Sequence, residues 1–126
     1  MLAVEAKASL PDLKLSEEQL KRYMSGMQCP MGVLITPEHI WVYRDLYTTR
    51  TPHSIQRIGD FDTKGLWQQP PPAEAKLFEV FVQEWLERPA QQPTQELPAN
   101  ISGIFREYVM PAVMNGEVRA AHPRYF

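Results

Sequence analysis

Two apolar, strand-like segments flank a single amphipathic helical segment in the first third of the chain. Residues 2–7 have the sequence Leu-Ala-Val-Glu-Ala-Lys, and residues 32–36 form an apolar run typical of a strand buried on both faces. A strand, a helix and a second strand in this order predict parallel pairing of the two strands, because the helix carries the chain back across the sheet. We therefore expect an α/β or α+β fold with a small mixed β-sheet and flanking helices.

The helix between these strands is expected to begin at Ser16, after a loop over residues 8–15. Ser16 and Gln19 fit the capping-box pattern, and Glu17 and Glu18 would occupy the first turn, where the helix dipole favours acids. The predicted buried stripe follows the spacing i, i+3, i+4, i+7 and consists of Leu20, Tyr23, Met24 and Met27. Cys29-Pro30 is expected to end the helix.

Further elements follow from composition. Residues 39–44 are rich in β-branched and aromatic side chains and predict the return strand of a hairpin, and residues 54–61 predict another strand. A helix is expected over residues 73–88, between proline-rich linkers at 68–72 and 89–98. Its buried face is predicted to consist of Phe78, Phe81, Val82 and Trp85.

The last part of the chain predicts one more helix and a tail. Asn100 can cap this helix, Asn115-Gly116 can stop it, and residues 119–126 are expected to be extended. Its predicted buried face is Ile101, Ile104, Phe105 and Tyr108. We expect residues 67–126 to form a helical extension within the same domain as a core made by residues 1–66.

Composition narrows the class of protein. The chain has 126 residues, of which 44% are hydrophobic and 22% charged, values typical of a globular domain. No apolar run is long enough to cross a membrane, no signal peptide is visible, and Cys29 is the single cysteine. A cytoplasmic location is expected. The net charge of −2 argues against a protein that coats nucleic acid generally, but not against a nuclease with a local basic surface.

Glu5 and Lys7 are the first candidate functional residues. Residues i and i+2 of a strand point to the same face, so the carboxylate and the amine should project together. Such a pair can supply a metal ligand and a group that positions water. The alternative is a solvated ion pair of little energetic value.

The segment Val4-Glu5-Ala6-Lys7, followed by a helix and an apolar hairpin, resembles the (D/E)XK strand of the PD-(D/E)XK nuclease superfamily. A second match lies on the helix, where Gln19 and Tyr23 have the QxxxY spacing of the RecB-type branch. The string from Tyr23 to Tyr43 also resembles the nuclease domain of type I restriction motor subunits. The resemblance covers roughly residues 1–62 and implies a restriction-endonuclease-like core.

The resemblance implies a metal-dependent nuclease domain acting on DNA phosphodiester bonds. Glu5 and the carbonyl of Ala6 would hold magnesium or manganese, and Lys7 would orient the attacking water and stabilise negative charge. Gln19 and Tyr23 would complete the catalytic group. Lys21 and Arg22 would contact nearby phosphates of the DNA.

One departure from the family pattern affects this expectation. The family places an essential Asp on the strand before the (D/E)XK strand, whereas this chain begins four residues before Glu5. We expect a truncated domain, a site completed by another chain, or loss of catalysis. Asp12, Asp60 and Asp62 are alternative oxygen ligands, and spacing favours none of them.

Two further function classes remain open. One is a non-catalytic interaction or regulatory module of the same fold, acting as a homodimer because loss of the upstream strands would leave a sheet edge exposed. The other is a regulatory or scaffold protein that has no nucleic-acid role, which the slightly acidic composition favours.

Overall fold

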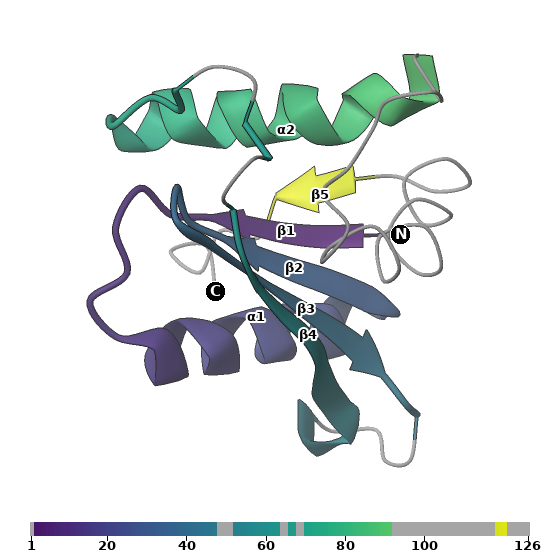
Figure 1. Ribbon diagram of the computed structural model, residues 1–126. Helices are drawn as coiled ribbons and strands as arrows, with labels where there is room; N and C mark the ends of the chain where they lie inside the picture. Colours follow the sequence, from purple (N-terminus) through teal and green to yellow (C-terminus); the bar gives the residue numbers. More distant parts are fainter. Residues whose placement is uncertain (1, 48–51, 64–65, 68–69, 92–117, 121–126) are drawn as a thin grey trace.

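The structure is a computed structural model that describes residues 2–47, 52–63, 66–67, 70–91 and 118–120 (Figure 1). Its elements, in chain order, are β1 (Leu2–Ala6), α1 (Leu13–Met27), β2 (Met31–Ile35), β3 (His39–Asp45), the short 3₁₀ helix η1 (Pro52–Ser54), β4 (Ile55–Asp62), α2 (Ala75–Gln91) and β5 (Val118–Ala120). Within the described residues, no helix has the length and apolar character needed to cross a membrane.

The five strands form one mixed sheet in the order β4-β3-β2-β1-β5. β1 pairs in parallel with β2, from Leu2 opposite Met31 to Ala6 opposite Ile35, and β2, β3 and β4 pair antiparallel in sequence. The predicted fold class and the parallel pairing across the first helix are therefore confirmed.

α1 and α2 cover opposite faces of this sheet, which gives three layers (Figure 1). Each face has its own apolar core. The core under α2 combines Leu2 and Val4 of β1 with buried side chains of α2, among them Phe78 and Val82. The core under α1 combines Ala3 with Leu20, Met24 and residues of β2 and β3. Successive residues of β1 thus alternate between the two cores, as the strand period of two requires.

The first helix begins earlier than expected, at Leu13, and Asp12 is its N-cap. The Asp12 carboxylate accepts a hydrogen bond from the backbone N–H of Leu15 at 3.1 Å. The predicted capping box was wrong, because an Asx cap that follows a proline satisfies the first free N–H groups before Ser16 is reached. Ser16 is instead buried beneath the helix, and Glu17 and Glu18 lie beyond the first turn.

The buried stripe of α1 is shorter than the pattern predicted. Leu20 and Met24 are fully buried and Tyr23 is half-buried, but Met27 is 36% exposed. The reason is that the helix ends at Met27, where Gln28 adopts a left-handed conformation with φ of 56°. The chain then turns toward β2 through Cys29, which is buried as a small apolar side chain, as expected.

The second half of the chain required several corrections. α2 extends from Ala75 to Gln91, so Pro89 belongs to the helix and not to a linker. Its buried side chains are Phe78, Val82, Trp85 and Leu86, while the predicted Phe81 is only partly buried. The strand expected over 54–61 is β4. The helix expected from Asn100 and the tail after residue 120 lie outside the described residues.

The sheet edge that motivated a dimer is covered within the chain. Val118, Arg119 and Ala120 form β5, which pairs in parallel with Leu2, Ala3 and Val4. β1 is therefore an interior strand, and the expectation that it forms an exposed edge was wrong. Three residues without a clear alternating pattern gave no sequence indication of this strand.

Gly32 packs closely against Met24, and this contact gives the first prediction. A Cβ atom at Gly32 would clash with Met24 Sδ, and Met24 is fully buried. We expect Gly32→Ala to destabilise the protein by about 2 kcal/mol through overpacking. Gly26→Ala is the control, because nothing lies within 4 Å of its Cβ position and it should stabilise α1 by about 0.5 kcal/mol. Urea denaturation measures the change in stability of both variants. Equal changes would contradict the close packing of Gly32 against Met24.

Candidate functional site

Glu5 and Lys7 meet at the end of β1. Lys7 Nζ lies 3.3 Å from Glu5 Oε1, as their positions two residues apart predicted. The Glu5 side chain is only 3% exposed, whereas that of Lys7 is 33% exposed. Glu5 Oε2 is buried without a hydrogen-bond partner among the described residues. A buried carboxylate oxygen without a hydrogen-bond partner costs stability, because its lost hydration is not replaced.

The surroundings of Glu5 favour its protonated form. Burial raises the pKa of the Glu5 carboxyl above its usual value, and the ion pair with Lys7 opposes this without overcoming it. The carboxylate of Glu79, on α2, adds a smaller upward push on the same pKa. A cation placed beside Oε2 would reverse this balance, because it would stabilise the ionised form directly.

The carbonyl of Ala6 is directed away from β2. The Lys7 N–H donates to the carbonyl of Ile35 in β2 at 2.8 Å, and the carbonyl of the same peptide group points the opposite way. That side belongs to β5, whose described pairing with β1 ends at Val4. The Ala6 carbonyl thus lies beyond the described ladder.

Gln19 and Tyr23 lie on one flank of α1, one turn apart. Glu17 and Lys21 mark the other flank, because they reach β3 and β4 on the far side of β2. With 100° between successive helical residues, Gln19 and Tyr23 face roughly the opposite direction, toward β1. Tyr23 packs half-buried against the core that contains Ala3. The structure therefore places this pair on the side of the strand that bears Glu5.

A second polar cluster, missed in the sequence, joins α1 to the hairpin. Glu17 Oε2 accepts a 2.5 Å hydrogen bond from Tyr43 Oη and bonds from Arg57 Nη2 at 2.6 Å and Nε at 3.0 Å. Burial raises the pKa of the Glu17 carboxyl, but these hydrogen bonds outweigh it and hold the pKa below its usual value. Burial and the bond to Glu17 raise the pKa of Tyr43. The partners are 26 and 40 residues apart, so no local pattern predicts them.

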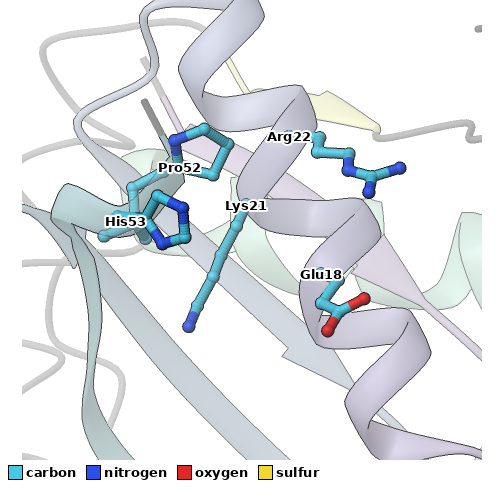
Figure 2. Close-up of a pocket in the computed structure, with 6 residues that line it drawn as sticks. Glu18, Lys21, Arg22, Pro52 and His53 are labelled. Carbon is cyan, nitrogen blue, oxygen red and sulfur yellow. The ribbon is translucent and has the colours of Figure 1, made fainter. Parts of the chain in front are cut away.

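Lys21 and Arg22 are not at the Glu5–Lys7 pair. They line a pocket of about 490 Å³ between α1 and η1, together with Glu18, Pro52, His53 and Ile55. Figure 2 shows the Lys21 side chain extending past the His53 ring, whereas Arg22 and Glu18 project from the outer side of the helix. The structure thus separates the two residues expected to contact phosphate from the residues expected to act on it.

Within the part of the chain that the structure describes, few oxygen donors lie near Glu5. The described residues contain no group of three or more His, Cys, Asp or Glu side chains that could hold a metal ion. Asp60 and Asp62 lie on β4, three strand spacings from β1, or about 14 Å. Asp12 caps α1. Magnesium is often held by one or two carboxylates plus water and substrate phosphate, so Glu5 and Ala6 meet only the lower limit of this requirement.

Comparisons with known proteins give no match for this chain. No protein-family model, no curated protein and no solved structure is significantly similar to it. The roles of these residues are therefore inferred from their positions, burial and charges.

The opposite pKa shifts of Glu5 and Glu17 give the second prediction. Because its pKa is raised, Glu5 favours folding below pH 4.5, and this contribution is lost as the pH rises through its pKa in the folded protein. Because its pKa is lowered, Glu17 favours folding above pH 4.5, and its contribution is lost as the pH falls.

We expect Glu5→Gln to stabilise the protein at pH 7 by on the order of 1 kcal/mol, because it removes a buried charge. Glu17→Gln should destabilise it by about 2 kcal/mol, because charge-assisted hydrogen bonds are weakened. Denaturant titrations at pH 4 and pH 7 measure both differences. Changes in the free energy of unfolding that have the same sign at pH 7 would contradict the opposite roles given to Glu5 and Glu17.

Proposed function

We propose that the chain is a metal-dependent nuclease-like domain of the PD-(D/E)XK type that acts on DNA phosphodiester bonds. The observation that carries the proposal is the buried Glu5 at the end of an interior strand: its Oε1 pairs with Lys7, and its Oε2 has no hydrogen-bond partner among the described residues. A carboxylate in this position lowers stability, as expected for a group kept for binding or chemistry.

The arrangement around this pair supports the same proposal. α1 covers the face of the sheet to which Ala3 points, which by alternation is also the face of Glu5 and Lys7. Gln19 and Tyr23 lie on the flank of α1 toward β1. A strand bearing an acid and an amine, followed by a helix that crosses to a parallel strand, is the order that the resemblance requires.

Each residue then has a defined role. Glu5 and the Ala6 carbonyl would hold magnesium or manganese, which offsets charge on a transferring phosphoryl group and acidifies bound water. Lys7 is partly exposed and can donate hydrogen bonds to water or to a phosphate oxygen. Gln19 and Tyr23 would hold the nucleic-acid backbone. DNA as substrate is consistent with a cytoplasmic location.

Cation binding and cleavage test this proposal. We expect manganese, titrated calorimetrically in the presence of a non-cleavable phosphorothioate DNA, to bind the wild type but not Glu5→Gln. Lys7→Ala should keep cation binding and lower cleavage of plain DNA by about 100-fold, since a positioned charge-stabilising donor has this value.

Glu84→Gln is the matched control for the charge change at Glu5. It removes an exposed carboxylate of α2 that is not among the charges acting on Glu5, so it should leave cation binding intact. Cation binding that survives Glu5→Gln, or cleavage that survives both Glu5→Gln and Lys7→Ala, would overturn the proposed site.

The second candidate function is a non-catalytic module that acts as a homodimer. The observation that favours it is the outward surface of α2, where Leu77 is 58% and Val80 is 54% exposed, one turn apart. Sedimentation at micromolar concentration should then show a dimer that Leu77→Glu dissociates. A purely regulatory protein would bind no DNA at any salt concentration.

A further inference from the structure

The pocket between α1 and η1 has a wall of basic residues and an apolar floor. Lys21 and Arg22 come from α1, His53 comes from η1, and the buried Ile55 at the start of β4 closes the bottom. Figure 2 shows the Lys21 side chain alongside the His53 ring, while Arg22 projects from the outer side of the helix. Residues more than 30 positions apart in the chain therefore line one pocket.

The charges around the pocket leave a positive balance. Lys21 and Arg22 carry two positive charges and Glu18 one negative charge among the lining residues. Glu17, the next acid along α1, already accepts two bonds from Arg57. The remaining cations and a histidine that can donate a hydrogen bond match an anion of small radius with several acceptor oxygens.

The pocket position is fixed by contacts on both sides. Lys21 Nζ lies 5.9 Å from the centre of the Tyr43 ring, which limits how far its amine can move. Ser54, next to His53, donates a 2.6 Å hydrogen bond to Asp45, and the backbone N–H of Leu46 donates to its carbonyl. η1 is thus tied to the end of β3, and His53 is held facing α1.

We propose that this pocket binds a phosphate group of a nucleic-acid strand, through Lys21, Arg22 and His53. The proposal rests on the proposed nuclease-like function and adds to it a phosphate site away from Glu5 and Lys7. The bound phosphate is not the one that reacts. The pocket instead sets the path of the strand across α1, so its loss weakens binding without changing the chemical step.

Binding of a fluorescein-labelled DNA duplex, followed by anisotropy over a range of salt concentrations, tests the pocket. We expect Lys21→Ala and Arg22→Ala each to weaken binding several-fold and to lower the salt dependence by about one counterion. Glu18→Gln should tighten binding, because it removes the opposing charge. His53→Ala should weaken binding as well. These positions are exposed or half-buried, and thermal melts will check that each variant folds.

Lys76→Ala is the matched control, because it removes an exposed lysine from α2 on the other side of the sheet. An equal loss of affinity in Lys76→Ala, or no loss in Lys21→Ala, would overturn the pocket. Inorganic phosphate, titrated while the His53 ring is followed by NMR, separates the two sources of ligand. Binding of free phosphate without DNA binding would overturn nucleic acid as the ligand.

Cleavage kinetics separate this inference from the proposed function. If both hold, pocket variants raise KM with kcat unchanged, whereas Lys7→Ala lowers kcat. If neither the wild type nor any variant cleaves DNA but Lys21→Ala still weakens DNA binding, the nuclease proposal fails and the proposed phosphate site is supported. If Lys7→Ala abolishes cleavage and Lys21→Ala changes neither binding nor KM, the pocket fails.

Discussion

The parallel pairing of β1 with β2 is the constraint on which the rest of the structure depends. It requires α1 to cross one face of the sheet, and α1 in turn covers Ala3, Leu34 and Tyr43 on that face. Because β1 is an interior strand with helices on both sides, its alternate residues are buried in two separate cores. Glu5 is buried for the same reason, since it occupies a position that an apolar side chain would fill in most strands of this kind.

The carboxylates of Glu5 and Glu17 therefore have opposite effects on the stability of the folded protein. Glu17 accepts hydrogen bonds from Tyr43 and Arg57, which connect α1 to the hairpin. One oxygen of Glu5, in contrast, has no hydrogen-bond partner among the described residues. The contrast separates an acid that the protein itself satisfies from one whose second oxygen it leaves unsatisfied among the described residues. It also explains why α1 can present different residues on its two flanks, since the Glu17 contacts fix its rotation over the sheet.

The sequence pattern predicted those helices and strands whose buried faces can be read from a few consecutive residues. The strand at β1, the helix stripe at Leu20 and Met24, and the apolar run at β2 were found because their periodicity is contained in a few residues. The helix start was misplaced, since Asp12 and Ser16 are both good caps and sequence alone does not rank them. The Glu5–Lys7 pair was predictable within one strand, while the pocket between α1 and His53 depends on tertiary contacts that no spacing encodes.

The pairing of β5 with β1 has a consequence for synthesis and folding. Leu2, Ala3 and Val4 receive their second neighbour from Val118, Arg119 and Ala120, at the far end of the described chain. A growing polypeptide can assemble β1 to β4 and α1 long before those residues are made, and β1 then presents an unpaired edge to its surroundings. Closure of the sheet by β5 is a long-range step, so the edge of β1 stays open to aggregation until residues 118–120 have been made and have paired with it.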